Sequence, residues 1–572
     1  MNDFQAIPIR AASQTPLLAL SPLGSRLVLE ISAGRASIAS SFLARSPATR
    51  LVNLRLSDSE WEEVISSAAG LSCGDQQTGG LLDKADYLVE GQSPDVIILS
   101  GIETLYDPQS LLMGLRARCA PGAVCLVAAP NVAHWSVLVE QMAGRWSTAR
   151  SQSIDRPVAG FFTRQSLITL LRETGWTVVD TTPIVGDQDQ TEAAVEAFGT
   201  AARTLGIESA TLKDELAATQ WIARATNGPP APQITIAALG MKKVAGVTDA
   251  RIDHPMAAMA SRVSIRAAWG AGGVEIPGHW PPGVLILHRQ FLDSSAFVDT
   301  LEKRIAKGWI VVSEIDDDPA HWPAYAAAGH RAFRGVHAVT VSTEALAEVV
   351  RQWNPTVAVL PNAVPYLPEA SQTSPKSGGR LRLFFGALNR VSDWQPILSA
   401  ITSIGAVFRD QLEFVVVHDR AFFDALGDVP KSFTPTLDYD AYLASLASCD
   451  IALLPLTDTR FNRLKSDIKL IECAAAGVVP ICSPIIYGED SAHGEIALFA
   501  VTPQDWAASL SHLITDRDAL RKRRAAGLEY VTARRMQVHQ IDQREGVFRQ
   551  WLDNAAVLEE ARHQRLASSP DI

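Results

Sequence analysis

The chain has 572 residues, of which 47% are hydrophobic and 20% charged, a balance typical of folded globular proteins. A single hydrophobic core does not serve a chain of this length, and a prior of roughly 150 residues per domain predicts three or four structural units. The formal net charge is −11, from 51 basic and 62 acidic residues, which argues against a nucleic-acid partner held by bulk electrostatics.

The cysteines and the apolar runs favour a cytoplasmic protein. The N-terminal stretch MNDFQAIPIR lacks the apolar core of a signal peptide, and no apolar run reaches the ~18 residues that span a bilayer. The six cysteines show no metal-ligand spacing, and several lie in apolar runs, which favours buried reduced thiols. The basic run at 521–524 could make peripheral contact with an anionic membrane, although such a run is more often a solvated helix face.

Residues 1–185 alternate between short apolar runs and helical stretches. The runs Leu27–Ile31, Asp95–Leu99 and Ala123–Ala129 are typical of buried strands. Their alternation with helices predicts an α/β domain with a parallel sheet and a cleft at the carboxyl ends of its strands.

Three segments of this domain, VLEISAGRAS, PDVIILSGIETLYDP and FFTRQSLITLLRETGW, resemble a class I S-adenosylmethionine-dependent methyltransferase. The resemblance implies a Rossmann-like domain at 1–185, S-adenosylmethionine as its cofactor, and Glu30, Gly34 and Glu103 as the remnants of its site. Two of the family's three glycines are replaced, by Ser32 and Ala36, and no acid ends the strand at 51–55. Because added side chains crowd the pocket, we expect weak or absent cofactor binding. A docking scaffold is favoured, and a working methyltransferase stays open.

Residues 186–245 form a bridge between strand-rich regions. The stretch 186–223 has helix-like spacing, and the prolines of 228–232 then end any helix. The run 234–239 predicts one more strand, at the edge of the first sheet, before a linker that follows Met241.

Residues 246–372 again predict a doubly wound α/β layer, because apolar runs are separated by helical or polar stretches. The expected strands are Val263–Trp269, Val284–Leu287, Trp309–Ile315, Ala338–Val341 and Val357–Leu360. Polar clusters follow three of them, and the candidate acceptor or cleft residues in these loops are Arg289, Asp316, Asp317 and Asn362. The three aspartates 316–318 could hold Mg²⁺. A cap for the helix that starts at Pro319 is favoured, so no metal site is predicted.

Residues 373–530 follow a polar hinge at 371–379 and contain the segment 461–487, which predicts a loop, a helix, a tight turn and a buried strand. Ser466 or Asp467 can cap the start of the helix. Lys469 and Glu472 lie three residues apart and share a helix face. A cation, a carboxylate and open backbone N–H groups beside a parallel sheet suggest a nucleotide site. From this pattern alone, an ordinary βαβ unit is an equal alternative.

The segments GALNRVSDW and CDIALLPLTDTRFNRLKSDIKLIECAAAGVVPICSPIIY, with VSEIDDDP, VSTEALAEVV and VLPNAV upstream, resemble a GT-B glycosyltransferase of the family-four, group 1 type. The resemblance covers roughly residues 250–555. It implies two Rossmann-like lobes at 246–372 and 373–530 that face each other across a cleft, followed by helices at 531–572 that brace the first lobe.

The resemblance also assigns roles to individual residues. It implies that Glu472 accepts hydrogen bonds from the donor ribose, and that Arg390, with Lys465 or Lys469, neutralises the donor diphosphate. The family often has a second glutamate, contacting the donor sugar, where this chain has Leu464. The implied donor site consists of Asn389, Arg390, Lys465, Ser466, Asp467, Lys469 and Glu472.

The expected activity is therefore that of a hexosyltransferase that acts with retention. It would move a sugar from a nucleotide-sugar co-substrate to a glycan or lipid-linked glycan acceptor, in bacterial surface polysaccharide or glycoconjugate synthesis. No cofactor is required for this transfer. Two other hypotheses stay open: a bifunctional glycosyltransferase and methyltransferase, and a non-catalytic scaffold of two degenerate enzyme domains.

Overall fold

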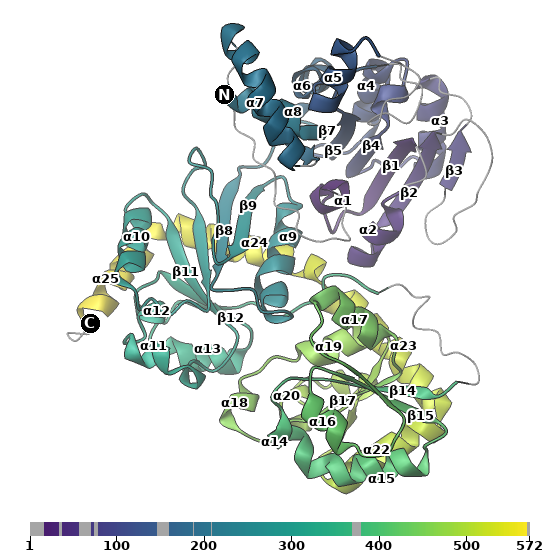
Figure 1. Ribbon diagram of the computed structural model, residues 1–572, viewed down its shortest axis with the longest axis vertical. Helices are drawn as coiled ribbons and strands as arrows, with labels where there is room; N and C mark the ends of the chain where they lie inside the picture. Colours follow the sequence, from purple (N-terminus) through teal and green to yellow (C-terminus); the bar gives the residue numbers. More distant parts are fainter. Residues whose placement is uncertain are drawn as a thin grey trace. The chain divides into compact units, whose positions relative to one another are not determined.

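A computed structural model describes residues 16–33, 37–56, 70–73, 78–145, 160–186, 188–206, 209–368 and 379–568. The chain divides into two compact units. The first contains the residues up to Ile234 together with Met259–Ala267 and Pro277–His279, and the second contains Thr235–Ala258, Ala268–Ile276 and Trp280–Ile572. Helices and strands alternate along both units (Figure 1), as the sequence predicts for an α/β protein.

The first unit contains a seven-stranded sheet with the order β3-β2-β1-β4-β5-β7-β6. The strands β1 to β5 pair in parallel, whereas β7 runs antiparallel to both β5 and β6. The strands are β1 (Leu27–Ala33), β2 (Arg50–Leu56), β3 (Gly70–Cys73), β4 (Val96–Ser100), β5 (Val124–Pro130), β6 (Thr177–Val185) and β7 (Ala218–Thr226). The helices are α1 (Pro16–Leu20), α2 (Ala39–Arg45), α3 (Thr78–Val89), α4 (Pro108–Arg118), α5 (Trp135–Met142), α6 (Arg164–Glu173), α7 (Gln188–Thr204) and α8 (Ser209–Ala217).

Two expectations about residues 186–245 were wrong. The helical stretch expected at 186–223 ends with α8 at Ala217, and the next residues form β7, which is paired on both sides inside the first sheet. The strand expected at the edge of the first sheet is β8 (Ile234–Gly240), which instead pairs in parallel with β10 (Val284–His288) of the next sheet. A strand's partner depends on tertiary packing, so its own sequence leaves the choice of sheet open.

The second unit contains two six-stranded sheets. We call the part built on the sheet β13-β12-β11-β10-β8-β9 the first lobe. Its other strands are β9 (Ile265–Ala271), β11 (Ile310–Ile315), β12 (Ala338–Val341) and β13 (Val357–Val359). The neighbours β8 and β10, β10 and β11, β11 and β12, and β12 and β13 each pair in parallel. Its helices include α9 (His254–Ala260), α10 (Ser295–Ile305), α11 (Pro323–Ala327), α12 (Arg331–Arg334) and α13 (Glu344–Arg351), with short turns η2 (Asp249–Asp253) and η3 (Pro319–His321).

We call the part built on the parallel sheet β16-β15-β14-β17-β18-β19 the second lobe. Its strands are β14 (Leu381–Gly386), β15 (Leu412–Val417), β16 (Lys431–Thr434), β17 (Ile451–Leu454), β18 (Val479–Cys482) and β19 (Leu498–Phe499). Its helices are α14 (Val391–Trp394), α15 (Leu398–Val407), α16 (Arg420–Ala425), α17 (Tyr439–Ala447), α18 (Arg460–Arg463), α19 (Ile468–Ala475), α20 (Pro484–Tyr487), α21 (His493–Ile496), α22 (Pro503–Thr515) and α23 (Arg517–Arg534), with the turn η5 (Gln395–Ile397) after α14.

Helices cover both faces of the second-lobe sheet, because successive side chains of a strand point to opposite faces. Phe385 belongs to a core cluster with α15 and α22, whereas its neighbour Phe384 belongs to a cluster with α17, α19 and α23. This double cover explains why β14, β15, β17 and β18 are almost continuously apolar. It also fixes the position of α19, whose residues Leu470, Ile471 and Cys473 are buried against the sheet.

Two neighbouring segments connect the lobes. Val364, just after the first lobe, pairs with Met536, just after α23. Its N–H donates to Arg535 O at 2.8 Å, and Gln537 N–H donates to Val364 O at 2.9 Å. Beyond the turn η6 (Gln537–His539), α24 (Ile541–Asp553) and α25 (Ala555–Ala567) return to the first lobe (Figure 1).

The return of these helices confirms the predicted brace. Arg562 in α25 binds both carboxylate oxygens of Glu302 at 2.8 Å, and Arg565 donates to Val336 O at 2.7 Å.

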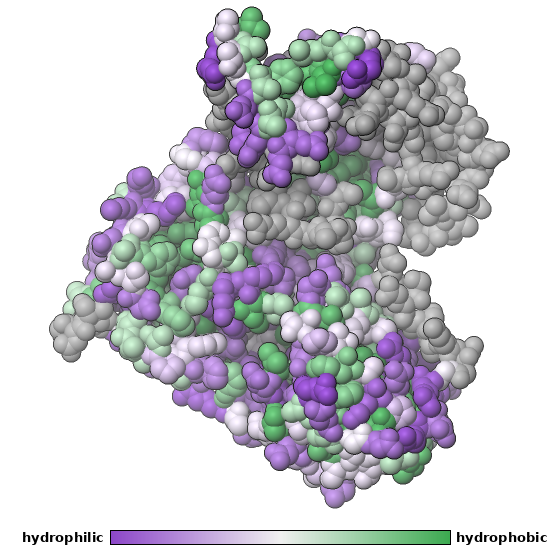
Figure 2. Space-filling view, in the orientation of Figure 1, coloured by the Kyte–Doolittle hydropathy of each residue, from purple (hydrophilic) through white to green (hydrophobic). Residues whose placement is uncertain are grey.

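The surface in Figure 2 mixes hydrophilic and hydrophobic residues over both lobes. None of the helices in the described ranges combines the length and the apolar character that a membrane crossing requires. Within the basic run at 521–524, Arg521 pairs with Asp518, Arg523 donates to two backbone carbonyls, and Arg524 binds Asp450. These three arginines therefore bind the protein's own acceptors, which favours the helix-face interpretation of this run over the membrane one.

Candidate functional site

The loops at the carboxyl ends of the central strands have unusual backbone geometry. Arg289 follows β10, Asn389 follows β14 after two residues, and His418 follows β15. All three have positive φ angles, of 55°, 56° and 73°. Residues held in this sparsely populated region cluster at functional sites. Ligands of doubly wound sheets also bind beyond the carboxyl ends of the strands.

Two of the predicted donor-site cations of the second lobe lie around one aromatic ring. Lys465 Nζ is 4.0 Å from the centre of the Phe461 ring, and the Arg390 guanidinium is 5.8 Å from it. Arg390 Nη1 also donates to Asp393 Oδ2 at 3.2 Å and to Asn462 Oδ1 at 3.0 Å. Asn389 is exposed in the same loop as Arg390. The two cations thus gather at one end of the β14–β17 strand pair.

Asp393 holds this loop together, although sequence reasoning did not single it out. Its Oδ1 accepts from the Thr457 N–H at 2.9 Å, from Thr457 Oγ1 at 2.7 Å and from Asn462 Nδ2 at 2.9 Å. The carboxylate is buried. Asp393 is the only acid of the GALNRVSDW segment, but the sequence does not reveal its role, because Thr457 and Asn462 lie more than 60 residues further along the chain.

Lys469 and Glu472 occupy the buried side of α19, as their spacing predicts. Lys469 Nζ donates to Gly386 O at 2.8 Å and to Tyr442 OH at 3.1 Å. Tyr439 OH donates to Glu472 Oε1 at 3.0 Å, and Glu472 is only 4% exposed. Burial lowers the pKa of Lys469 and raises the pKa of Glu472, while each charge favours the other. Neither tyrosine is among the residues expected from the sequence.

The start of α19 lacks the side-chain cap that we expected. Asp467 is the N-cap residue, but its side chain makes no capping hydrogen bond. Instead, both of its carboxylate oxygens bind Arg535 Nη atoms, at 2.5 and 2.8 Å. The Leu470 and Ile471 N–H groups donate to the backbone carbonyl of Asp467. The Asp467 carboxylate therefore does not cap the start of α19, an end of a helix that favours anions.

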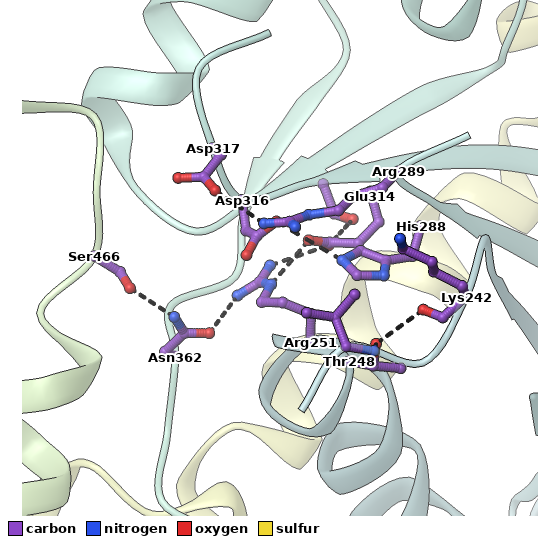
Figure 3. A network of polar contacts seen from close by, with 12 residues as sticks. Lys242, Thr248, Arg251, His288, Arg289, Glu314, Asp316, Asp317, Asn362 and Ser466 are labelled. Atoms are coloured by element: carbon purple, nitrogen blue, oxygen red, sulfur yellow. Dashed lines mark hydrogen bonds and ion pairs between the residues drawn. The ribbon is translucent and has the colours of Figure 1, made fainter. Parts of the chain in front are cut away.

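In the first lobe, the predicted cleft residues form two linked ion clusters (Figure 3). Arg289 Nε donates to Asp316 Oδ1 at 2.7 Å, and Arg289 Nη2 donates to Asp317 Oδ2 at 3.0 Å. Burial alone would raise the pKa of Asp316, but Arg289 and His288 hold it below its usual range. Asn362 belongs to the second cluster, with Arg251 and Glu314.

The segment that precedes α19 contacts the first lobe at several residues. Arg460 Nε donates to Asp318 Oδ2 at 3.1 Å, and Lys465 Nζ donates to Asp317 Oδ1 at 2.8 Å. Leu464, between them, is 6% exposed and belongs to the hydrophobic core cluster of the first lobe. Its carbonyl accepts from Thr343 Oγ1 at 3.3 Å. The structure therefore joins the first-lobe candidates to Lys465 of the segment 460–467, which contains several of the predicted donor-site residues and which we call the donor loop.

Leu464 thus has a structural role that the sequence did not reveal. Its side chain packs in the core of the opposite lobe. At the corresponding position, the family that the sequence resembles often has an acid that contacts the sugar.

Among the aspartates at 316–318, Asp318 caps the turn that follows, whereas Asp316 and Asp317 bind Arg289 and Lys465. Asp318 Oδ1 accepts from the Ala320 N–H at 3.0 Å at the start of η3, which confirms the predicted cap. Among the described residues, no group of three or more histidine, cysteine, aspartate or glutamate side chains is arranged to hold a metal ion.

In the first unit, Glu30 is already bound by its neighbours. Its Oε2 accepts from Ser37 Oγ and from Asn53 Nδ2, both at 2.6 Å, and its Oε1 accepts from the Ile38 N–H at 2.9 Å. The side chain is 1% exposed. Glu103 lies in the short turn η1 (Ile102–Thr104) after β4, and Gly34 lies outside the described residues.

No protein-family model and no curated protein matches the chain. Many solved structures are similar to it. A structure of HepE from Anabaena in complex with UDP and glucose is 13% identical, with a TM-score of 0.40, and the match covers 55% of this chain and 98% of that one. A glycosyltransferase from Rickettsia africae is 10% identical, with a TM-score of 0.40 and coverage of 57% and 100%. A UDP-forming α,α-trehalose-phosphate synthase from Burkholderia xenovorans is 12% identical, with a TM-score of 0.35 and coverage of 46% and 73%.

Proposed function

We propose that the second unit is a glycosyltransferase of the GT-B type that takes a nucleotide sugar as donor. The observation that carries this proposal is the gathering of Arg390, Lys465 and the uncapped start of α19 at the carboxyl edge of the second-lobe sheet. Two cations beside the start of a helix at one sheet edge form a site for a diphosphate.

The proposed chemistry follows from the charge that develops during transfer. When the sugar leaves its nucleotide, negative charge builds on the departing diphosphate, and hydrogen bonds from Arg390 and Lys465 strengthen as it does. Glu472 is our candidate for the ribose hydroxyls, with Lys469 beside it. The acceptor would be a hydroxyl of a glycan or lipid-linked glycan, presented from the first-lobe side near Arg289 and Asp316. Retention of the anomeric configuration belongs to the same proposal and is checked by the NMR spectrum of the product.

The first experiment is a thermal shift with a panel of nucleoside diphosphates, starting with UDP, which the Anabaena structure contains. We expect one of them to raise the melting temperature, and E472A to weaken that shift markedly. Release of the same nucleoside diphosphate from its sugar conjugate then measures turnover. If no diphosphate shifts the melting temperature, the proposed donor site is wrong.

For the first unit, we propose a docking or scaffold domain derived from a methyltransferase-like fold. The commitment of Glu30 to Ser37, Ile38 and Asn53 supports this proposal, because a carboxylate with three internal donors has less capacity left for a cofactor. Calorimetry with S-adenosylmethionine tests it. Binding of S-adenosylmethionine at micromolar concentrations would instead favour the bifunctional enzyme.

A further inference from the structure

A chain of hydrogen bonds links the buried core of the first lobe to the donor loop of the second (Figure 3). Arg251 Nε and Nη2 donate to the two carboxylate oxygens of Glu314, at 2.8 and 3.0 Å. Arg251 Nη1 donates to Asn362 Oδ1 at 2.9 Å and to Leu360 O at 2.8 Å. Asn362 Nδ2 in turn donates to Ser466 Oγ at 2.7 Å.

The direction of every hydrogen bond in this chain is fixed. A guanidinium only donates, so the Asn362 atom that faces Arg251 is the carbonyl oxygen, and the amide nitrogen faces Ser466. The amide has no reversed orientation that keeps both contacts. Arg251 is itself immobilised, because its side chain is 1% exposed and paired with a Glu314 side chain that is 3% exposed. Thr340 Oγ1 donates to the same glutamate at 2.8 Å.

Ser466 is therefore an acceptor toward the first lobe. A hydroxyl carries one proton and accepts with its lone pairs, so a serine that accepts from Asn362 has its own proton available for another acceptor. Ser466 precedes Asp467, the N-cap residue of α19. The proton is thus offered beside the helix start, where an anion is favoured.

The backbone of Asn362 is held at the same place. Arg535 Nη2 donates to Asn362 O at 3.3 Å and to Asp467 Oδ1 at 2.8 Å. The same arginine thus contacts the residue before α19 and the residue that orients Ser466. Asn362 is 5% exposed, so both its side chain and its carbonyl are fixed from inside the protein.

We propose that Asn362 is a positioning residue that makes Ser466 a hydrogen-bond donor to the diphosphate of the donor nucleotide. The inference rests on the proposed function and deepens it, because it makes the diphosphate subsite depend on a side chain of the first lobe. Asn362 acts through Ser466 and does not itself touch the ligand.

The test is a double-mutant cycle read by the affinity for UDP, or for whichever diphosphate the thermal-shift panel selects. S466A removes the donated proton, and we expect it to weaken binding about fivefold, equivalent to ~1 kcal/mol. S466T keeps the hydroxyl and should restore binding. N362D reverses the polarity, because the new carboxylate accepts the Ser466 proton. We expect a loss of about tenfold in the wild-type background but only about twofold in the S466A background.

Two control measurements distinguish the possible outcomes. N554D makes the same substitution at an exposed position of the second unit and should leave the affinity unchanged. Uridine has no phosphate, so its affinity should be the same in all variants if the second lobe stays folded. Equal losses from N362D in both backgrounds would overturn the role of Asn362. A wild-type protein that binds none of the diphosphates would overturn the donor site itself.

Discussion

Lys465 Nζ lies 2.8 Å from Asp317 Oδ1, so a cation that we assign to the donor diphosphate is bound to a carboxylate of the opposite lobe. Both side chains are largely buried, at 18% and 17% exposure. Burial lowers the pKa of Lys465, and Asp317 partly offsets this effect. A diphosphate that binds Lys465 therefore has to compete with Asp317 or share the cation with it.

We expect D317N to tighten nucleoside diphosphate binding. The substitution keeps the shape of the side chain but removes a negative charge next to the anion site, and like charges repel at this distance. An improvement of about fivefold, or ~1 kcal/mol, is a reasonable size for a partly buried pair. Isothermal titration measures it, and the affinity should also become more sensitive to salt, because the variant site carries a larger net positive charge for salt to screen.

The matched control is D458N. Asp458 binds Arg463 of the same segment, but both side chains are more than half exposed and both belong to the second lobe. This variant should leave the affinity unchanged. Weaker binding by D317N than by D458N would mean that Asp317 supports the ligand instead of competing with it.

We expect L464A to destabilise the second unit by ~2–4 kcal/mol, the usual cost of a cavity in a packed core. Leu464 contributes to the first-lobe core although it comes from the second lobe. Denaturant unfolding gives the free energy. L528A is the control, because Leu528 is 41% exposed and its truncation should cost far less. A similar cost for both variants would contradict the packing role of Leu464.

His337 should make the protein less stable as the pH falls from 6.5 toward 4. Burial lowers the pKa of His337 to about 4, and the nearby Glu559 only partly offsets this effect. Between that value and the ordinary ~6.5, the unfolded chain takes up a proton that the folded protein does not, so acid favours unfolding. At pH 5 the loss amounts to about 2 kcal/mol relative to pH 7.

H337N tests this expectation, because asparagine does not titrate and can still accept the Val311 N–H that His337 Nδ1 accepts at 2.9 Å. The free energy of unfolding of the variant should change less between pH 7 and pH 5. An unchanged pH dependence would show that His337 does not contribute to it.

The brace of α25 should depend on Arg562. This side chain is 2% exposed and binds both Glu302 of α10 and Glu559 of its own helix. R562A removes the two-oxygen contact to Glu302 that ties α25 to α10, together with the packing of a buried side chain. The helix should therefore detach more often, and its amide hydrogens should exchange at least tenfold faster. R549A is the control, since Arg549 pairs with Glu545 inside α24. Equal exchange in both variants would contradict the brace.

The sequence predicted the strands of the second unit well, because parallel strands that are covered on both faces are continuous apolar runs. Ala338–Val341 has the bounds that the pattern predicts. The helix expected over the first residues of β7 and the sheet expected for β8 were both wrong, since each depends on partners that are distant in the chain. A run such as Ile234–Leu239 can pair in either sheet without a change in its own sequence.

For the candidate site, the sequence identified residues that stand next to recognisable structure, such as Lys465 and Ser466 before α19. It did not identify Asp393, Tyr439 or Arg251, because these side chains matter through partners far along the chain. The capping pattern of Asp467 was recognised, but its carboxylate binds Arg535, which follows α23. The sequence shows which groups can donate or accept hydrogen bonds. Which partner each group binds depends on the tertiary structure.

The place of Leu464 in the first-lobe core has a consequence for synthesis and folding. The first lobe's strands are complete by residue 359, yet one member of its core cluster comes more than 100 residues later. A fragment that ends before residue 464 would present an unfilled apolar socket to water. During synthesis, the first lobe would therefore leave the ribosome with this apolar cavity unfilled. Its core would be completed only after a large part of the second lobe has been synthesised.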